Sequence, residues 1–507
     1  MVDVGRQLPR PVLPTAGFNN LKDTLDDPVA YFLGTRYEAV LYPEARGEYY
    51  GLPPHKQAMF AAPAELPFRT NGFSPLVSYG RGGLAEAWTA GVYPLNDAEL
   101  SAFPISYADL EPHYSDLADR IGICGVQDDL ARFHPWHANL TSPLDLDEHS
   151  NRLLASYAAR RSTINNSRAF FGRSRIAVLS SDKGDREACS YKGRCLWGCP
   201  TRSLYTPSDT LADCIASTSF SYLPQHYVSH FSFDSRHRIQ SVVANSLEDG
   251  SSHDIAVGQL VLAAGTISSA RIFLDSIYRD SGERLCLPGL MDNRQLLVPY
   301  FNPQMVGTPF DPDTYQYHQL AVTIEANRPD ENVHCQITTL KTALAHPLIQ
   351  SVPLDSRTAL DIFRRVRSGL GIINVNFHDT RRKRNAIGIT RTSGDGVSRS
   401  LIRYVPPLGE RGRIRQALRA IKRSMKQLGC FVLPGLTHTR PMGASVHYAG
   451  TLPMSRVERP LTCSSDCRSH DFDNLYFVDG TTFPFLPAKN LTFTLMANAV
   501  RVADSSF

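Results

Sequence analysis

Three segments near the C-terminus combine residue types that could perform acid–base chemistry. They read Val446-His-Tyr-Ala-Gly-Thr451, Asn474-Leu-Tyr-Phe-Val-Asp-Gly480 and Asn490-Leu-Thr-Phe-Thr494. Taken singly, each has a simple structural interpretation: His447 as an ordinary histidine, Asn490 as a helix N-cap, and Asp479-Gly480 as a turn. A neutral imidazole, however, can accept a proton near neutral pH. The order and spacing of all three segments together therefore indicate a catalytic region rather than three unrelated features.

A second candidate site is a group of closely spaced cysteines, Cys189, Cys195 and Cys199. Thiolates are soft ligands that bind zinc or iron–sulfur clusters. Because only three are present locally, they fit an incomplete three-iron (3Fe-4S) cluster better than a four-thiolate zinc site. The alternative is a structural loop with free thiols or one disulfide. Cys463 and Cys467 favour a disulfide or unpaired thiols.

Composition limits the classes of protein that these sites can belong to. The chain has 507 residues, of which 42% are hydrophobic and 20% charged, so it is globular rather than disordered. The net charge of +4 gives no basis for a nucleic-acid partner. No apolar run reaches the ~18 residues of a membrane span, and residues 1–17 lack a signal-peptide pattern. The compartment is unknown, with the cytoplasm as the default expectation.

The elements that must position these residues follow from local patterns. Residues 6–79 are rich in proline and predict extended chain wrapped over a core, without regular structure. Alternating or continuous apolar residues predict strands, and capped amphipathic segments predict helices. The expected strands are 228–233, 239–245, 259–265, 320–325 and 372–377, and the expected helices are 106–121, 266–274 and 410–428.

The C-terminal segments resemble the signature of the glucose–methanol–choline (GMC) flavin oxidoreductases: H-x-x-G-T, then N-L-Y-V-x-D-G/A, then N-P-x-L-T. Three further segments agree with that family. Gly82-Gly83 followed by Trp88 resembles its flavin-contacting segment. Residues 103–114 resemble W-P-I-S-Y-x-D-L-E-P-Y-Y, and residues 261–271 resemble V-V-L-A-A-G-A-I-x-S-x-R. The chain is therefore identified as a member of this family, with the weakest likeness between residues 300 and 440.

The resemblance implies an α/β fold in which a Rossmann-like FAD-binding domain is interleaved with a strand-rich α+β substrate domain. The FAD-binding domain would comprise residues 1–30, 75–100, 205–300 and 440–507. The substrate domain would be residues 301–439, and residues 31–74 and 101–204 would form wrapping and cap segments.

The resemblance also implies which residues form the site. His447 would be the base that removes the hydroxyl proton of an alcohol or sugar, and Asn490 would be its partner. FAD would be bound non-covalently, because Ala87 stands where some family members carry a flavin-linking histidine. The expected cofactor-binding residues are Asp3, Gly82, Gly83, Trp88, Val228, Ala264, Gly265, Asp479, Gly480 and Thr492.

One departure from the family concerns the N-terminus. A dinucleotide fold begins with strand, G-x-G-x-x-G and helix, followed by an acidic residue after the second strand. Here Met1-Val-Asp-Val-Gly5 resembles that second strand, with Asp3 as the ribose-binding acid, so the first βα unit is expected to be missing. The expected explanation is a late start codon or a truncated record. The alternative is a shortened protein that holds FAD poorly.

Three functions follow. The first is a GMC-type FAD-dependent alcohol or sugar dehydrogenase or oxidase, whose electron acceptor is unknown. The second is a non-catalytic GMC-like remnant or scaffold subunit. The third is an electron-transferring subunit in a complex, which would make the cysteine trio essential; that trio also resembles the one in the catalytic subunit of bacterial FAD-dependent glucose dehydrogenase.

Overall fold

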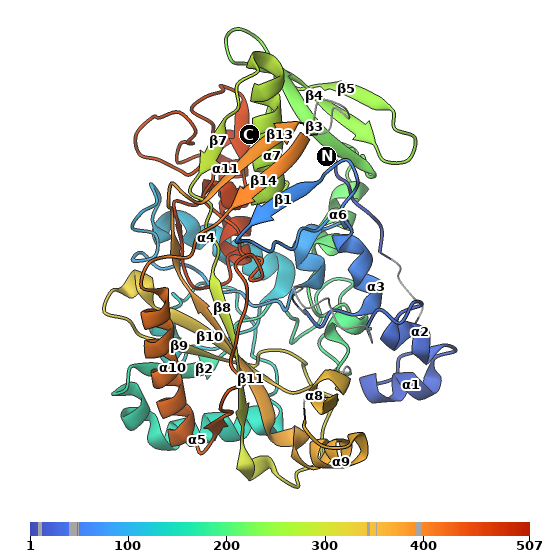
Figure 1. Cartoon of the computed structure of the whole chain (residues 1–507), viewed down its shortest axis with the longest axis vertical. Helices are drawn as coiled ribbons and strands as arrows, with labels where there is room; N and C mark the ends of the chain where they lie inside the picture. The colour runs from blue at the N-terminus through green and yellow to red at the C-terminus, as the bar shows by residue number, and fades with distance from the viewer. Residues whose placement is uncertain (9–12, 40–47, 49, 342–344, 351, 392–397) are drawn as a thin grey trace.

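The computed structural model describes residues 1–507 except 9–12, 40–47, 49, 342–344, 351 and 392–397. Figure 1 shows two regions along the long axis of the molecule: a large sheet with two helices beside it below, and smaller sheets around helix α7 (Thr266–Ser281) above. Within the described residues, no helix combines the length and apolar character needed to cross a membrane.

The lower region is built on a seven-stranded antiparallel sheet in the order β15-β8-β11-β10-β9-β2, with β16 also pairing with β8. The strands are β2 (Ala169–Arg173), β8 (Arg294–Phe301), β9 (Leu320–Ile324), β10 (Val333–Thr339), β11 (Leu370–Phe377), β15 (Phe431–Val432) and β16 (His438–Thr439).

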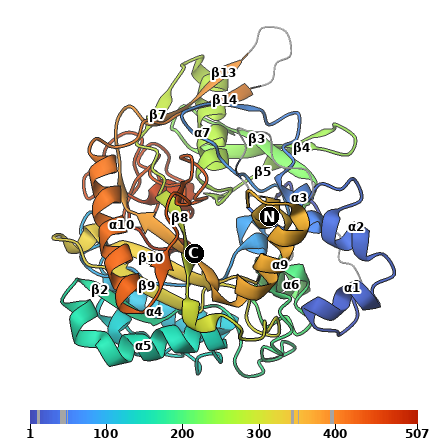
Figure 2. The same cartoon turned by 60° about the horizontal axis from the view of Figure 1, so that its bottom comes forward.

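The two faces of this sheet differ because side chains alternate along each strand. Leu296 and Val298 of β8 and Val375 of β11 are fully buried on the apolar face, where they pack with side chains of α5 (Glu148–Asn165) and α10 (Glu410–Gln427). Figure 2 shows both helices beside this sheet. Burial of each such side chain contributes roughly 1.5–3 kcal/mol. The opposite face carries polar residues and borders the site described below.

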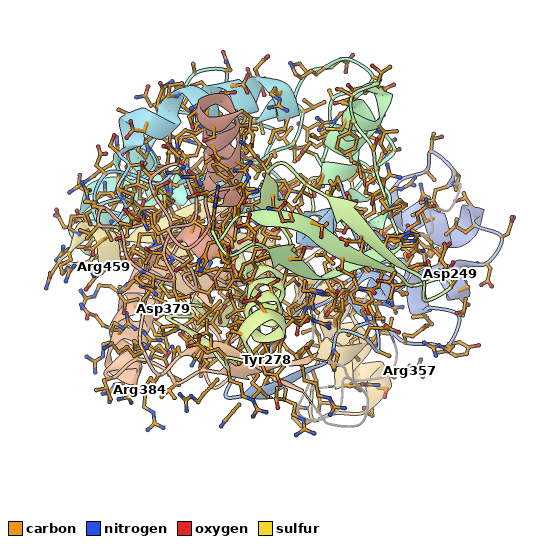
Figure 3. All side chains as sticks on the ribbon, turned by 90° about the horizontal axis from the view of Figure 1, so that it is seen from above. Asp249, Tyr278, Arg357, Asp379, Arg384 and Arg459 are labelled. Atoms are coloured by element: carbon orange, nitrogen blue, oxygen red, sulfur yellow. The ribbon has the colours of Figure 1, made fainter. Side chains whose placement is uncertain are left out.

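The upper region combines short sheets around α7. A four-stranded sheet has the order β1-β14-β13-β7, a three-stranded sheet the order β3-β4-β5, and β6 pairs in parallel with β17. Figure 3 places Asp249, at the β4–β5 turn, on the opposite side of the view from Arg459, with α7 and Tyr278 between them. The strands of these short sheets are β1 (Phe68–Asn71), β3 (His226–Phe233), β4 (Ile239–Ser246), β5 (Ser252–Ala256), β6 (Leu260–Leu262), β7 (Cys286–Pro288), β13 (Ala386–Arg391), β14 (Ser398–Arg403) and β17 (Leu475–Phe477).

The other helices and strands lie between or around these two regions. They are α1 (Leu21–Thr24), α2 (Pro28–Leu33), α3 (Pro54–Gln57), α4 (Tyr107–Leu117), α6 (Pro207–Ala216), α8 (His346–Gln350), α9 (Ser356–Val366), β12 (Asp379–Thr380), β18 (Phe485–Leu486) and α11 (Thr492–Ser506).

The predicted strands and helices listed above are all confirmed, with boundaries that shift by up to seven residues, the most at the end of α7. The expectation for residues 6–79 was wrong, since this segment contains α1, α2, α3 and β1. Proline starts two of those helices, at Pro28 and Pro54, where its missing N–H is not needed for a helical hydrogen bond. Residues 1–5 form only an isolated parallel bridge, between Val2 and Leu223, rather than a full strand.

Candidate functional site

A cavity of about 540 Å³ lies between the polar face of the seven-stranded sheet and a set of loops from the upper region. The sheet side is lined by Gln295 of β8, Gln336 of β10, and Asn374 and Asn376 of β11. The loop side comes from residues 82–91, 263–268, 444–448 and 490–492. One side of the cavity is therefore formed by the loops that carry the sequence motifs, and the other side is a sheet face that carries none of these motifs.

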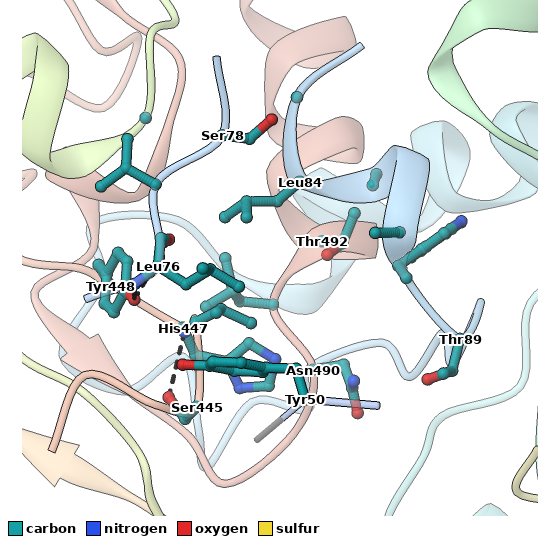
Figure 4. A pocket seen from close by; sticks show the side chains of 18 of the residues that line it. Tyr50, Leu76, Ser78, Leu84, Thr89, Ser445, His447, Tyr448, Asn490 and Thr492 are labelled. Atoms are coloured by element: carbon teal, nitrogen blue, oxygen red, sulfur yellow. Dashed lines mark hydrogen bonds between the residues drawn. The ribbon is translucent and has the colours of Figure 1, made fainter. Parts of the chain in front are cut away.

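His447 lines this cavity next to Asn490, as Figure 4 shows. Its Nδ1 lies 2.8 Å from Oδ1 of Asn293, the residue just before β8. Asn293 Nδ2 donates to the carbonyl oxygens of Phe377 (2.7 Å) and Pro487 (2.9 Å), so its Oδ1 is the atom left to accept. His447 Nδ1 must therefore carry the proton and donate it, which leaves Nε2 with its lone pair unprotonated.

The surroundings keep this imidazole neutral. His447 is only 8% exposed. Burial, with a smaller contribution from the positive charge of Arg440, lowers the pKa of His447 to about 4. Within the described residues Nε2 has no hydrogen-bond partner, so at neutral pH the ring presents a free proton acceptor.

Asn490 precedes α11 but does not cap it, since the N-cap position is Leu491 and no side-chain cap is made. Its Oδ1 instead accepts a hydrogen bond from Nε2 of Gln336, at 2.9 Å. This contact orients the amide so that Nδ2 is available as a donor in the cavity. His447 and Asn490 together therefore offer one acceptor and one donor, which are the groups that an alcohol hydroxyl requires.

Seven of the predicted cofactor-binding residues line the cavity: Gly82, Gly83, Trp88, Ala264, Gly265, Asp479 and Thr492. Gly83 and Gly265 have φ of +70° and +82°, and a Cβ on either would meet no atom within 4 Å. Backbone without side chains at these points leaves room for a flat ring to approach closely. These residues therefore fit a flavin, and the N-terminus of α7, at Thr266, adds backbone N–H groups at the same wall.

The other three predicted cofactor-binding residues, Asp3, Val228 and Gly480, are outside the cavity lining. Asp3 accepts a hydrogen bond from Tyr222 Oη at 3.1 Å, and burial raises the pKa of Asp3. The carbonyl oxygen of Val228 accepts from Arg271 at 2.5 Å. Packing requires glycine at position 480, because a Cβ there would lie 2.2 Å from the carbonyl oxygen of Tyr448.

The cysteine trio lines a small separate hollow, and Cys189, Cys195 and Cys199 are all free thiols. Burial raises the pKa of Cys189 and of Cys195, whereas at Cys199 hydrogen bonds, that of the Leu204 backbone foremost, outweigh burial and lower the pKa. Among the residues that the structure describes, no group of three or more His, Cys, Asp or Glu side chains is placed to hold a metal ion. The expectation of an iron–sulfur cluster is therefore not supported. Cys463 and Cys467 are likewise free and buried, so the disulfide alternative was wrong there.

Sequence reasoning missed the residues that orient the candidate base and its partner. Asn293, just before β8, holds His447, and Gln336 of β10 holds Asn490. The only signal was the polar run Asp292-Asn-Arg-Gln295 directly before the apolar residues of β8, together with polar residues alternating along Asn374-Val-Asn376. Neither pattern indicates by itself which loop its side chains meet.

Comparison with known proteins agrees with this arrangement. Residues 382–499 match the family model described as GMC oxidoreductase. The 6'''-hydroxyparomomycin C oxidase of Streptomyces lividus is 22% identical over 428 residues, which cover 79% of this chain and 71% of that protein. The predicted resemblance to the GMC oxidoreductases is therefore confirmed.

Solved structures share the fold. The structure of pyridoxine 4-oxidase from Mesorbium loti matches with a TM-score of 0.59 and 15% identity, covering 99% of this chain and 93% of that one. An FAD-dependent oxidoreductase from Chaetomium thermophilum matches with a TM-score of 0.51 and 13% identity, covering 85% and 86% of the two chains. The fold is accordingly the mixed α/β fold with a strand-rich part that the sequence predicts.

Proposed function

We propose that this chain is an FAD-dependent oxidoreductase that acts on the CH–OH group of an alcohol or sugar, with His447 as the base. The observation that carries the proposal is the hydrogen bond between His447 Nδ1 and Asn293 Oδ1, which leaves Nε2 free in the cavity beside Asn490. A base needs an unprotonated nitrogen within reach of the substrate, and this contact fixes which nitrogen that is.

The residues around the cavity would divide the reaction between them. The Asn490 amide N–H would hold the substrate oxygen, and His447 Nε2 would accept the hydroxyl proton. A bound flavin would supply the acceptor for the hydride, which leaves the carbon that carries the reacting hydroxyl. Gly83, Gly265 and the N-terminus of α7 are the groups that would hold the flavin, while the buried sheet face would keep bulk water from the substrate.

The test is anaerobic mixing of the FAD-loaded protein with a panel of primary and secondary alcohols and sugars, followed by the loss of flavin absorbance. We expect reduction by at least one substrate and a loss of roughly 10²-fold or more in its rate for His447→Ala, because general-base catalysis contributes ~10²–10⁴. His253→Ala, which alters an exposed histidine of β5, is the matched control and should retain the full rate. Equal rates in His447→Ala and in the unaltered protein would contradict the assignment of the base, and no reduction by any substrate would favour the non-catalytic remnant.

We further propose that β6 belongs to a Rossmann-like sheet whose first βα unit is missing from these residues. In the described part of the chain β6 pairs with β17 alone, so the backbone groups of its other edge are unpaired by any strand. An apolar strand with one unpaired edge is a place for another strand. Addition of an upstream strand–G-x-G-x-x-G–helix segment should raise the FAD bound per chain, measured from its visible absorbance; stoichiometric FAD on residues 1–507 alone would contradict this proposal.

A further inference from the structure

The sheet side of the cavity carries four amide side chains from three neighbouring strands. Gln336 of β10 is the register partner of Asn374 on β11, and Asn376 is the partner of Gln295 on β8. Since side chains two residues apart on a strand share a face, all four lie on the same face of the sheet. We call these residues the amide wall.

A chain of hydrogen bonds fixes the orientation of half of this wall. Arg440, which can only donate, donates to Oε1 of Gln295. Gln295 Nε2 then donates to Oδ1 of Asn376 at 2.9 Å. Asn376 is therefore turned so that its Nδ2 is the atom left over, and this buried nitrogen has no hydrogen-bond partner among the residues that the structure describes.

Within the described part of the chain, two more buried polar atoms at the wall lack hydrogen-bond partners, and one is assigned as an acceptor and the other as a donor. Oδ1 of Asn374 is an unpaired acceptor, and one terminal nitrogen of Arg440 is an unpaired donor. Asn376 is 1% exposed and Arg440 is 9% exposed. Because a buried polar group without a partner costs ~1–3 kcal/mol, three of them at one cavity wall point to a ligand that supplies the missing partners.

The charges at this wall are already balanced. Arg440 Nε donates to Glu48 Oε1 at 2.7 Å, and both side chains are nearly buried. Among the described lining residues the only carboxylate is Asp479, whose two oxygens accept from Ser269 Oγ and from the Thr481 N–H. A cationic group at the wall would therefore find no free carboxylate.

We propose that the amide wall is a subsite for the uncharged, polyhydroxylated part of the substrate, such as a neutral sugar ring or polyol. This inference rests on the proposed function, which places the reacting hydroxyl at His447. A hydroxyl both donates and accepts, so adjacent hydroxyls satisfy the Asn376 donor and the Asn374 acceptor together. An ammonium group would face the Asn376 and Arg440 donors, and the charge of Arg440 is already paired with Glu48, so no unpaired positive charge is left for a carboxylate.

The experiment compares D-glucose with cyclohexylmethanol, which lacks the additional hydroxyls, as reductants of the FAD-loaded protein. Asn376→Leu keeps the side-chain shape and removes both the unpaired donor and the oxygen that accepts from Gln295 Nε2, so any loss common to the two reductants measures the second change. We expect this variant to lose at least about tenfold in kcat/KM for glucose, and less than about twofold for cyclohexylmethanol, because only glucose loses a buried partner. Calorimetry should give a similar rise in the Kd of glucose, measured independently of turnover. Thr323→Val is the control, since Thr323 lies opposite His334 of β10 but outside the cavity lining.

The outcomes separate this subsite from the proposed function. Equal losses for both reductants, or no loss for either, would overturn the subsite while leaving the oxidoreductase standing. Tighter binding of D-glucosamine or of D-glucuronate than of glucose would overturn it as well. Should Asn376→Leu fail to fold, the unaltered protein decides: it must bind glucose at least about tenfold more tightly than cyclohexylmethanol, and a smaller ratio overturns the inference.

Discussion

The two walls of the cavity are built in different ways. The loop wall takes its form from local backbone features, such as the positive φ of Gly83 and Gly265, and carries the two residues proposed to act on the substrate, His447 and Asn490. The sheet wall takes its form from register, which aligns side chains far apart in the sequence, such as Gln295 and Asn376. The proposed chemistry therefore depends on residues in short segments, whereas the proposed choice of substrate depends on the pairing of strands that are far apart in the sequence.

The loop wall depends on a buried ion pair next to Asn490. Lys489 Nζ lies 2.6 Å from Glu99 Oε2 and also donates to the carbonyl oxygens of Pro94 (2.9 Å) and Phe133 (2.7 Å). Both side chains are almost fully buried; burial raises the pKa of Glu99 and lowers the pKa of Lys489. The pair therefore fixes the backbone that presents Asn490.

The largest effect on stability is expected from Lys489→Met. Removal of one partner leaves Glu99 buried without compensation, which costs about 3–5 kcal/mol in the free energy of unfolding. Urea unfolding would measure this loss. The double variant Lys489→Met/Glu99→Gln should recover part of it, because no buried charge remains.

Lys422→Met, at an exposed position of α10, is the matched control and should change stability by less than about 0.5 kcal/mol. A similarly small change for Lys489→Met would mean that the loop wall does not depend on the pair.

A smaller effect is expected from Asn293→Leu, which removes the hydrogen bond to His447 Nδ1. Without the Asn293 acceptor the Nδ1 proton of His447 is no longer held, so kcat should fall by about 10–10²-fold, as when the partner of a ligating histidine is removed. Asn293→Asp keeps an acceptor for the Nδ1 proton, so it distinguishes a role of Asn293 in positioning His447 from a role in folding. A carboxylate facing Nδ1 favours the imidazolium, so the acid limb of the kcat/KM profile should move to higher pH. An unchanged profile in Asn293→Asp would argue against Asn293 as a positioning residue.

The difference between the walls also explains what the sequence could predict. Several residues of the loop wall could be expected at one site, because Gly82, Gly83, Asp479 and Asn490 sit in short motifs, whereas Asp3, Val228 and Gly480 were expected there too and lie outside the lining. Of the strands of the lower sheet, alternation at 320–325 and 372–377 predicted only β9 and β11. Their partners were not predicted, because Asn376 meets Gln295 only through a register set across many intervening residues. The role of Asn293 depends on the same long-range placement.

The effect that is smallest per measured step concerns Asp292, which joins the segment before β8 to the loop that carries His447. Its carboxylate accepts hydrogen bonds from Ser445 Oγ and from the Gly443 N–H at 2.6 Å, in the loop that carries His447. Burial, assisted by the nearby negative charge of Asp379, raises the pKa of Asp292 from 3.8 to about 7.

Between pH 4 and 7 the folded protein therefore keeps a proton that the unfolded chain has released. The folded state binds more protons, so this group makes the free energy of unfolding fall as pH rises, by at most about 1.4 kcal/mol per pH unit. Asn in place of Asp292 can still accept from Gly443 and can donate to Ser445, and it does not titrate. Urea unfolding of both proteins at pH 5, 6, 7 and 8 should show the unaltered protein losing stability relative to Asp292→Asn up to about pH 7 and running parallel to it above. Parallel behaviour over the whole range would mean that Asp292 is already ionised at pH 5, and that the loop bearing His447 is held by a charged carboxylate.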